Sequence, residues 1–487
     1  MLLSHLLSIP LPADVDREIT GLATDSRQVK AGHLFLALAG ENIHGAQFID
    51  KALQQGAAAI LKEHSAAEIN LLAEKVPCVN IPNLSQQVGT IAAQFYQHPS
   101  QQMNVIGITG TNGKTSTSHF IAQLLHQYSP CGLIGTLGYG VYGKLQLGLF
   151  TTPDALTLQG VFAQLRAQHV AQVVMEVSSH GLAQARIQGT QFDTAVFTNL
   201  SRDHLDYHHS MEEYGAAKQL LFTHYHVRTA VINIDDAFGH NLLHHLPSSV
   251  KALRYSLHHP MVEIYAKILR HDAEGYHIKL YTPWGKGEVL IPLLGEFNIS
   301  NVLAAVSVLL NHGIAFDELL NLLPSLRPVK GRMEKLGGGT QPTVVVDYAH
   351  TPDALQQTLH ALRKHTQGKL WCVFGCGGDR DQGKRPLMGK IAEELAEHVI
   401  LTNDNPRHEN PQIILQGILA GIHNPAAVQV IPERQAAIAY ALQHAHANDI
   451  VLIAGKGHED YQQIGDQRLN FSDQAVVKTC LESLHHD

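Results

Sequence analysis

The residues best suited to chemistry form the glycine-rich run GITGTNGKT at positions 107–115. Between a strand and a helix, the backbone N–H groups of such a loop can close on phosphate oxygens, and the N-terminus of the helix adds partial positive charge. Lys114 would reach the β- and γ-phosphates of a nucleotide, and the Thr115 hydroxyl would bind Mg²⁺. Ile108 occupies the first glycine position of the strict pattern, yet the run still predicts a phosphate-binding loop.

Possible metal ligands follow two further apolar runs. Glu176 lies at the end of one of them, and NLSRDHLD follows the run 195–198 at positions 199–206. Because parallel strands end at one edge of a sheet, these groups are expected near the phosphate loop, where Mg²⁺ needs ligands. A buried, paired Glu176 and a solvated turn at 199–206 are the structural alternatives.

Four polar loops in the second half of the chain each follow a predicted strand. They are DYAHTPD at 347–353, GCGGDRDQGKR at 375–385, NDNPRHEN at 403–410 and AGKGHED at 454–460. Ligands of doubly wound sheets bind at the carboxyl ends of the strands. One such loop could be an ordinary turn, but four of them predict a binding face.

Short β-branched runs alternate with helical stretches, which is typical of an α/β protein with parallel sheets. The length of 487 residues allows roughly three domains of about 150 residues. We expect a small α/β domain at 1–98, a central P-loop domain with a parallel sheet at 99–328, and a Rossmann-like α/β domain at 329–487. In the central domain, residues 115–128 predict a helix and 264–292 predict a β insertion.

Composition restricts the classes of partner. With 35 Lys and Arg against 43 Asp and Glu, the formal net charge is −8, so no global basic field exists to hold nucleic acid or anionic lipid. No apolar run approaches the ~18 residues that span a bilayer, and the opening MLLSHLLSIPLP is a poor signal peptide. Five cysteines without a C-x-x-C pair indicate a reducing compartment. We therefore expect a cytoplasmic protein that binds neither nucleic acid nor membrane.

The 33 histidines raise the question of a metal site. None stands in an H-E-x-x-H motif, and adjacent histidines of a strand point to opposite faces, so a doublet is a poor chelate. We expect most of these histidines to be solvated surface residues.

Taken together and in this order, the motifs resemble those of the Mur ligases, the ATP-dependent amide-forming enzymes of cytoplasmic peptidoglycan precursor synthesis. The resemblance is carried by GITGTNGKT at 107–115, EVSSHG at 176–181, NLSRDHLDYH at 199–208, GEFNISN at 295–301 and GRME at 331–334. The four C-terminal loops and TDSRQVKAGHLFLALAG at 24–40 look like those of the members that add 2,6-diaminopimelate. The similarity spans nearly the whole chain and is far more specific than any one motif.

The resemblance implies a reaction in two steps. Such enzymes phosphorylate the free D-Glu carboxylate of UDP-N-acetylmuramoyl-L-alanyl-D-glutamate with ATP, and the amine of the incoming amino acid then attacks the acyl phosphate. This chemistry needs a clamp for the γ-phosphoryl group, metal ions to offset its charge, and exclusion of water. The implied partners are ATP, Mg²⁺ and small-molecule substrates, and the implied working form is a monomer.

The resemblance also assigns residues to ATP and metal. The implied ATP-binding positions are Gly110, Thr111, Asn112, Gly113, Lys114, Thr115, Ser116, Asn298, Arg332 and Asp347. The implied metal ligands are Thr115, Glu176, His204 and Lys218, and the implied catalytic residues are Lys114, Lys218 and His204.

Lys218, in YGAAKQLLF, matches the lysine that this family carries as a carbamate, N6-carboxylysine. The modification turns an ammonium group into an anionic oxygen ligand that can hold a second Mg²⁺ beside the γ-phosphate. Because carbamylation needs the neutral amine, the protein must overcome an ordinary pKa of about 10.4.

For the UDP-sugar peptide, the resemblance implies contacts from Thr24, Ser26, Thr151, Thr152, Ser178, Gln184 and Arg186. Two places depart from the family pattern. Phe150 precedes the paired threonines where some relatives have Asn, and Glu41-Asn42-Ile43 stands where some relatives present His-Gln-Ala. These departures concern individual uridine and sugar contacts rather than the role of the domain.

For the amino acid, the resemblance implies contacts from Arg380, Asp404, Asn405, Pro406, Arg407, Gly455 and Glu459. Diaminopimelate differs from lysine by a second carboxylate at its distal end, and the planar guanidinium of Arg407 can bind this carboxylate in a bidentate way. Glu459 is available for the distal ammonium. Lysine-adding relatives lack the arginine.

Several other functions remain open at this point. A lysine-adding Mur ligase and a folylpolyglutamate-type synthetase would keep the fold, but Arg407 argues against the first and the motif at 24–40 against the second. A P-loop switch or binding module would turn over nucleotide without regard to any amino acid. A kinase would leave phosphate on an isolable product, whereas a ligase releases it.

Overall fold

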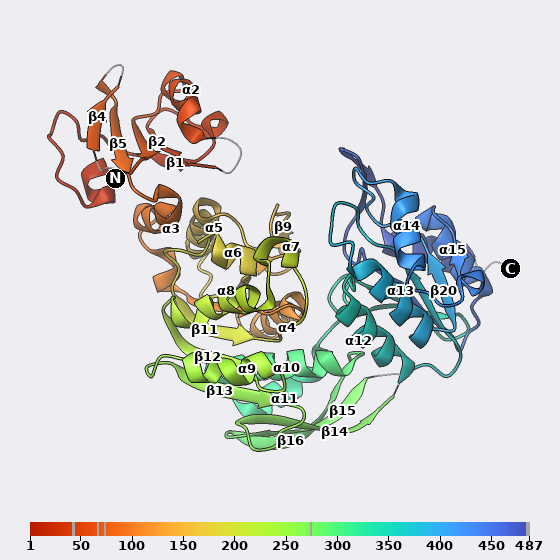
Figure 1. Cartoon of the computed structure of the whole chain (residues 1–487). Coiled ribbons are helices and arrows are strands. Elements are labelled where there is room, and N and C mark those ends of the chain that lie inside the picture. The colour runs from red at the N-terminus through yellow and green to blue at the C-terminus, as the bar shows by residue number, and fades with distance from the viewer. Residues whose placement is uncertain (41–43, 66–67, 73–74, 273–274, 484–487) are drawn as a thin grey trace.

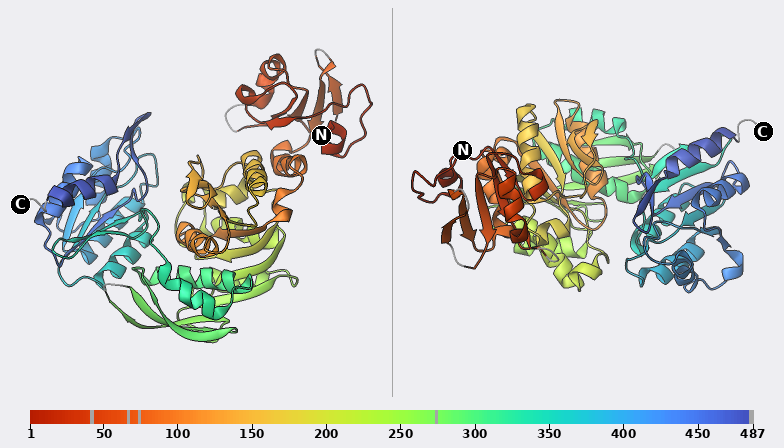
Figure 2. Two further views of the ribbon diagram at one scale, coloured as in Figure 1. Left: turned by 180° about the vertical axis from the view of Figure 1, so that it is seen from behind. Right: turned by 90° about the horizontal axis from the view of Figure 1, so that it is seen from above.

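The chain folds into three large β-sheets, each flanked by helices, that follow one another along the sequence (Figure 1). The structure is a computed structural model, and its described residues are 1–40, 44–65, 68–72, 75–272 and 275–483. The N-terminal and C-terminal parts lie on different sides of the central part in both views of Figure 2. The predicted three-part α/β architecture is confirmed.

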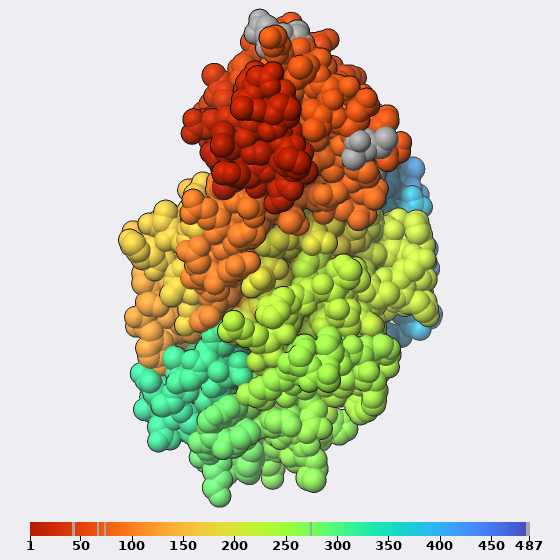
Figure 3. Space-filling model, turned by 90° about the vertical axis from the view of Figure 1, so that its left-hand side faces the viewer, coloured from red at the N-terminus to blue at the C-terminus, as the bar shows by residue number. Residues whose placement is uncertain are grey.

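The N-terminal sheet has the strand order β1-β2-β3-β5-β4, and only β4 pairs in the antiparallel direction. Its strands are β1 (Gly21–Ala23), β2 (His33–Ala37), β3 (Ala59–Glu63), β4 (Glu68–Leu71) and β5 (Pro77–Ile81), and its helices are α1 (Leu3–Leu7), α2 (Ile49–Gln54) and α3 (Leu84–Phe95). Leu34, Leu36 and Leu61 pack with Leu84 and Val88 of α3. In Figure 3 this part lies at one end of the molecule, and the green residues of the central part lie below it.

The central sheet has 11 strands in the order β16-β15-β14-β13-β12-β11-β6-β10-β7-β8-β9. Its strands are β6 (Asn104–Thr109), β7 (Cys131–Gly135), β8 (Gly138–Val141), β9 (Lys144–Gln146), β10 (Gln172–Glu176), β11 (Phe192–Phe197), β12 (Val227–Asn233), β13 (Lys251–Ser256), β14 (Ile264–His271), β15 (Tyr276–Thr282) and β16 (Gly285–Ile291). The strands from β14 through β7 in this order run parallel, and antiparallel hairpins extend both edges. The hairpins β14 to β16 are the β insertion expected at 264–292.

Helices cover both faces of the central sheet. On one face, Ile106 and Ile108 of β6 pack with Phe120 of α4 and Val302 of α10, and on the other face Val105 of the same strand packs with α5. The helices are α4 (Lys114–Leu125), α5 (Ala155–Ala167), α6 (Ser179–Ala183), α7 (Leu205–His208), α8 (Met211–Thr223), α9 (Ala237–Leu242), α10 (Glu296–Asn311) and α11 (Phe316–Leu322). This double burial explains why β6, β10 and β11 read as continuous apolar runs in the sequence.

The C-terminal sheet has the order β17-β18-β22-β19-β20-β21 and is parallel except for β17. Its strands are β17 (Glu334–Gly337), β18 (Thr343–Asp347), β19 (Leu370–Phe374), β20 (His398–Leu401), β21 (Gln429–Val430) and β22 (Ile450–Ala454), and β23 (Tyr461–Ile464) forms a hairpin with β24 (Gln467–Asn470). Its helices are α12 (Pro352–Arg363), α13 (Lys384–Leu395), α14 (Pro411–Leu419), α15 (Arg434–His444) and α16 (Asp473–Ser483). The four predicted polar loops follow β18, β19, β20 and β22, so they share one edge of this sheet.

Two helices near the predicted site begin at clear capping signals. The Ser210 hydroxyl accepts a hydrogen bond from the Glu213 N–H at 3.1 Å, which is the S-x-x-E start that places Lys218 on α8. The Thr351 hydroxyl caps α12, and Pro352 occupies its first position, where a missing N–H costs no hydrogen bond.

Several hydrogen bonds tie the central part to the C-terminal part. Asn112 of the glycine-rich loop donates to Asp353 of α12 at 3.1 Å, and Lys364 donates to Glu296 of α10 at 2.7 Å. The Lys364 and Glu296 pair is also an ion pair on the surface, where such pairs add little stability. No helix in the described part of the chain is long and apolar enough to cross a membrane.

The predicted elements differ from the observed ones mainly at their ends. The helix expected at 115–128 is Lys114–Leu125, because it begins directly after the glycine at 113 and is followed by turns. Most histidines are at least partly exposed, as expected, but His119 and His208 are less than a tenth exposed. His119 is buried because it lies on the face of α4 that points into the protein.

Candidate active site

The glycine-rich loop connects β6 to α4, and its shape depends on two glycines. Gly110 and Gly113 have φ angles of +149° and +84°, which side chains rarely adopt. A Cβ at Gly110 would collide with the Thr198 hydroxyl, and a Cβ at Gly113 would collide with the side chain of Asn301. The next residues, 111–116, line a cavity of about 530 Å³, which we call the phosphate cavity.

Two lysines, the half-buried Lys114 and the buried Lys218, meet at this loop. The ammonium groups of Lys114 and Lys218 donate hydrogen bonds to the Gly110 carbonyl at 2.7 and 2.9 Å, and Lys218 lies 4.3 Å from the centre of the Tyr214 ring. Burial lowers the pKa of Lys218 well below its ordinary value, and the positive charge of Lys114 lowers it further. Burial thus favours the neutral amine that a carbamate needs.

Glu176, at the end of β10, is tied to the loop. Its Oε2 accepts hydrogen bonds from the hydroxyls of Thr115 and Thr136 at 2.9 and 3.1 Å, and its Oε1 accepts one from the Thr136 N–H at 2.9 Å. Only 1% of Glu176 is exposed. The structure therefore brings together a hydroxyl and a carboxylate that sequence reasoning assigned to one metal ion, and both are hard oxygen ligands that suit Mg²⁺.

His204 lines the same cavity from the loop after β11. Its φ of +53° and the 3.4 Å distance from its Nε2 to Asp203 Oδ2 fix the ring beside that carboxylate. Burial lowers the pKa of His204 to about 4, although Asp203 opposes the shift. The ring is thus neutral near pH 7 and has a nitrogen lone pair available for a ligand.

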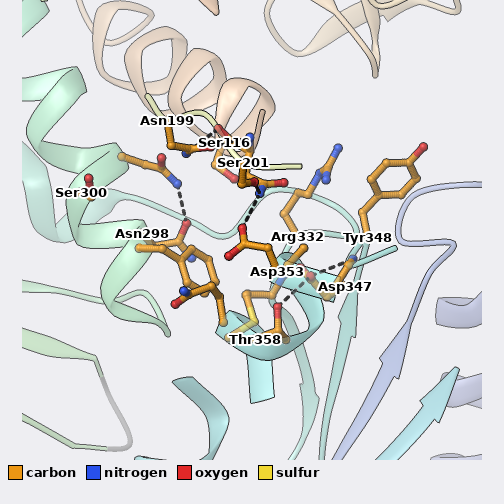
Figure 4. A pocket seen from close by; sticks show the side chains of 18 of the residues that line it. Ser116, Asn199, Ser201, Asn298, Ser300, Arg332, Asp347, Tyr348, Asp353 and Thr358 are labelled. Carbon is orange, nitrogen blue, oxygen red and sulfur yellow. Dashed lines mark hydrogen bonds between the residues drawn. The ribbon is translucent and has the colours of Figure 1, made fainter. Parts of the chain in front are cut away.

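A second cavity, of about 390 Å³, lies between α10 and α12 and is called the α10–α12 cavity here. In Figure 4, Asn298 and Ser300 of α10 lie on one side, Asp353 and Thr358 of α12 on the other, and Ser116, Asn199 and Ser201 come from α4 and the loop after β11. The predicted nucleotide residues Asn298, Arg332 and Asp347 all line it. Asp347 accepts hydrogen bonds from the N–H groups of Met333 and Ala349, so its carboxylate also holds the loop in shape. Burial raises the pKa of Asp347.

Arg332 joins the two cavities and lines both. Its guanidinium donates to the Thr115 hydroxyl at 3.3 Å and lies 4.3 Å from the centre of the Tyr348 ring. A fixed positive charge therefore stands where the loop meets the α10–α12 cavity, as a polyphosphate chain would require.

The residues predicted for the sugar peptide fall into two groups. In the central part, Thr151, Ser178 and Arg186 line the phosphate cavity, while Thr152 and Gln184 support them from behind. Arg186 donates to the Thr152 carbonyl at 2.9 Å and to Gln184 Oε1 at 2.6 Å. Its guanidinium also lies 4.5 Å from the centre of the Phe150 ring, so the residue that departs from the family pattern stacks on a predicted contact.

Thr24 and Ser26 form the second group and lie in the N-terminal part, just after β1. Asp25 caps the short helix at Ser26–Gln28 by accepting a hydrogen bond from the Arg27 N–H at 2.9 Å, and Ser26 is buried. Neither Thr24 nor Ser26 lines the cavities described above. The departure at 41–43 lies outside the described residues.

A third cavity, of about 310 Å³, lies between the loops of the C-terminal sheet and residues of the central part, and is called the C-terminal cavity. Six of the seven residues predicted for the amino acid line it, namely Arg380, Asp404, Asn405, Arg407, Gly455 and Glu459. Pro406 is buried beside them and does not line the cavity.

Arg407 lies in a loop and has a left-handed backbone conformation, which an α-helix would not allow. Its φ is +52°, and its Nη1 donates to the Gly378 carbonyl at 2.7 Å. Gly455, at φ +113°, allows the backbone to pass Asp404, since a Cβ there would lie 2.6 Å from the Asp404 carboxylate. The C-terminal cavity is therefore lined by the cationic Arg407 and by the anionic Asp404 and Glu459.

The C-terminal cavity is continuous with the phosphate cavity. Both are lined by His180, Asp203, His204, Tyr348, His350, Arg380, Arg407 and Glu459. Groups from the central and C-terminal sheets therefore surround one shared volume. Sequence reasoning overlooked His180 here and Asp353 in the α10–α12 cavity, and their only signal was their place inside two recognised strings, EVSSHG and DYAHTPD.

Comparison with known proteins matches this arrangement. The sequence profile of the Mur ligase middle domain matches residues 108–309, that of the Mur ligase glutamate ligase domain matches 331–457, and that of the Mur ligase family catalytic domain matches 18–96. A Coxiella burnetii protein named UDP-N-acetylmuramoyl-L-alanyl-D-glutamate–2,6-diaminopimelate ligase is 49% identical over 476 residues, which are 97% of each chain. The chain belongs to the Mur ligase family.

Further comparisons extend the similarity of this Mur ligase to other relatives. A Pseudomonas putida protein of the same printed name is 48% identical over 477 residues, which are 96% of each chain. A solved structure entitled as that ligase is 36% identical, covers 100% of both chains and has a TM-score of 0.73. MurF from Acinetobacter baumannii shares the fold at a TM-score of 0.66 and 18% identity, covering 99% of this chain and 96% of its own.

Proposed function

We propose that this Mur ligase joins meso-2,6-diaminopimelate to the D-Glu carboxylate of UDP-N-acetylmuramoyl-L-alanyl-D-glutamate, with ATP as the energy source and ADP and phosphate as products. This is a step of peptidoglycan precursor synthesis. The observation that carries the proposal is the phosphate cavity, which shares residues with both the α10–α12 cavity and the C-terminal cavity. Nucleotide, carboxylate and amine can therefore meet at one place.

ATP would lie across two of the cavities. The loop residues 110–116 would hold its phosphates, and the α10–α12 cavity with Asn298 and Asp347 would hold its nucleoside. Lys114 and Arg332 would offset the charge that spreads over the γ-phosphoryl oxygens as it transfers. Arg332 already lines both cavities and Lys114 lines the phosphate cavity, so little reorganisation is needed when ATP binds.

Mg²⁺ would be held by Thr115 and Glu176 on one side and by His204 and a carbamate on Lys218 on the other. The oxygen donors fit a hard cation, and the low pKa of Lys218 fits carbamylation. When bound, the metal supplies charge neutralisation for the transferring phosphoryl group. Mass analysis of the intact active protein would show the added carboxyl group, and an unmodified Lys218 in fully active enzyme would contradict this part.

The substrate carboxylate would enter beside Ser178 and Arg186. An oxygen of the D-Glu carboxylate attacks the γ-phosphorus and ADP leaves, which gives an acyl phosphate. The neutral amine of diaminopimelate then attacks the acyl carbon, the C–O bond to phosphate breaks, and the amine proton is lost. Closure of the C-terminal loops over the phosphate cavity would keep water from competing with the amine.

The C-terminal cavity would select the amino acid by charge. Arg407 and Arg380 would face the distal carboxylate, while Glu459 and Asp404 would face the distal ammonium. L-Lysine lacks the carboxylate and would leave the Arg407 guanidinium without its anion, which is costly in a partly buried site.

The wider organisation follows from the same reasoning. We propose that residues 1–98 bind the uridine end, 99–328 bind ATP and 329–487 bind the amino acid, since each range carries one of the three large sheets. All five cysteines are unpaired, which supports a cytoplasmic location. We propose a monomer as the working form, because one chain carries all three cavities.

The direct test is phosphate release together with the mass of the product. Purified protein receives Mg-ATP and UDP-N-acetylmuramoyl-L-Ala-D-Glu, with meso-diaminopimelate or L-lysine in parallel. Phosphate and tripeptide only with diaminopimelate are expected. Product with lysine instead would overturn the role of Arg407, and phosphate release indifferent to both amino acids would indicate a nucleotide switch.

A further inference from the structure

A buried lysine stands behind the C-terminal cavity and takes no part in the steps above. Lys456 is 0% exposed, and its ammonium donates hydrogen bonds to Asn405 Oδ1 at 2.9 Å and to Glu459 Oε2 at 3.1 Å. The ammonium also lies 5.4 Å from the centre of the Tyr461 ring. Lys456 does not itself line the cavity. Its ammonium group instead contacts Asn405 and Glu459, which do line the cavity.

These contacts fix the orientation of two side chains. Asn405 Oδ1 also accepts from the Gln463 N–H at 2.9 Å, and Asn405 Nδ2 donates to Glu459 Oε2 at 2.8 Å. Because an ammonium and a backbone N–H can only donate, the amide oxygen must face them and the NH₂ must face Glu459. Glu459 is thus held by two donors on Oε2, and within the described residues no hydrogen bond engages Oε1.

We infer that Lys456 is a positioning residue, which fixes Glu459 so that the enzyme distinguishes the stereoisomers of diaminopimelate at the distal centre. The inference rests on the proposed function. At that centre the ammonium and the carboxylate exchange places between the meso and LL isomers. Arg407 and Glu459 can distinguish the two isomers only if neither side chain moves toward the displaced carboxylate or ammonium group of the other isomer. The hydrogen bonds from Lys456 and Asn405 keep Glu459 in place.

The test substitutes Lys456→Met, which keeps the length of the side chain and removes its charge and hydrogen bonds. The KM for meso-diaminopimelate should rise about tenfold, because a charge-assisted hydrogen bond to Glu459 is lost. The ratio of kcat/KM for the meso isomer to that for the LL isomer should fall about tenfold. The KM values for ATP and for the UDP-sugar peptide should stay within about twofold, since neither touches this group.

Two further variants separate positioning from general damage. Lys456→Gln keeps one donor for Asn405 without the charge, and it decides the question if the Met variant does not fold. Lys390→Met removes an exposed lysine of α13, and it should change neither the isomer ratio nor the KM for meso-diaminopimelate. If Lys456 acts through Glu459, then adding Lys456→Met to Glu459→Gln should lower the isomer ratio no further.

Two outcomes would overturn the inference. One is a folded Lys456 variant whose isomer ratio equals that of the unchanged enzyme. The other is an equal rise of the KM for all three substrates, which would indicate a purely structural role. Absence of product from the unchanged enzyme with meso-diaminopimelate would instead contradict the proposed function, so the two failures are distinguishable.

Discussion

The phosphate loop and the C-terminal cavity hold charged groups in two different ways. The loop is one continuous run between β6 and α4, and its backbone shape depends on Gly110 and Gly113. The C-terminal cavity collects side chains from separate loops that follow strands of both the C-terminal and the central sheet. The loop residues are close in the chain, so their relative positions depend on local backbone geometry. The residues of the C-terminal cavity are far apart in the chain, so their relative positions depend on how the strand ends align.

This difference has consequences for substitution. In the proposed reaction, a side chain and the backbone of the loop would act on the same phosphates, so one change should damage the chemical step itself. In the C-terminal cavity, each side chain would meet a different part of the proposed amino acid. Changes there should alter affinity and selectivity for that amino acid and leave the handling of ATP intact.

Lys114→Met should have the largest effect. We expect kcat for phosphate release to fall about 10²–10³-fold, because a fixed positive charge at the transferring phosphoryl group is lost. The measurement is the steady-state rate at saturating substrates. Lys390→Met, on the exposed side of α13, is the matched control. A rate within a few fold of the unchanged enzyme would show that the loop does not act on the chemical step.

Arg407→Ala should come next and sharpen the comparison. The KM for meso-diaminopimelate should rise about 100-fold, because charge-assisted hydrogen bonds to the distal carboxylate are lost. The KM for ATP should not change, and the preference over L-lysine should largely disappear. Initial rates with each amino acid and each nucleotide concentration measure this. Equal increases for ATP and diaminopimelate would remove the proposed contrast between the two regions.

His119→Gln tests the support of the phosphate loop rather than its chemistry. Burial lowers the pKa of His119 to about 4, whereas the unfolded chain titrates near 6.5, so the unfolded state binds more protons as the pH falls from 7 to 5. The native protein should lose about 2 kcal/mol of stability from this residue over that range, and the variant should not.

Urea denaturation followed by circular dichroism at pH 7 and pH 5 measures the difference. The same substitution at the exposed His226 is the control and should leave the pH dependence unchanged. If the His119→Gln variant loses as much stability between pH 7 and pH 5 as the unchanged protein, then His119 is not the source of that loss.

Phe150→Leu should have the smallest effect. Removing the ring that stacks on Arg186 should raise the KM for the UDP-sugar peptide about 2- to 5-fold, which corresponds to the ~0.5–1 kcal/mol of an exposed cation–π contact. The KM values for ATP and diaminopimelate should not change. Leu147→Ala alters a neighbouring exposed residue as a control. No rise with Phe150→Leu would mean that Arg186 is held in place by Thr152 and Gln184 alone.

Most of the residues predicted from the sequence line one of the three cavities, but sequence reasoning could not show which of them are in contact. The strings GITGTNGKT and DNPR identify groups, because their chemistry lies in residue types and short spacings. The contact between Asn112 and Asp353 spans 241 positions and was not foreseen. The stacking of Phe150 on Arg186 was also missed, since a departure from a pattern shows only that something differs.

The sequence by itself determined the alternation of buried strands and helices, the glycine-dependent loop and the types of ligand groups. These features depend on local backbone preferences and on the identity of side chains close in the chain. The tertiary structure decided that Lys218 shares the Gly110 carbonyl with Lys114, and that Lys456 fixes Glu459. Burial and the charge of Lys114 lower the pKa of Lys218, and both depend on which strands and helices pack together.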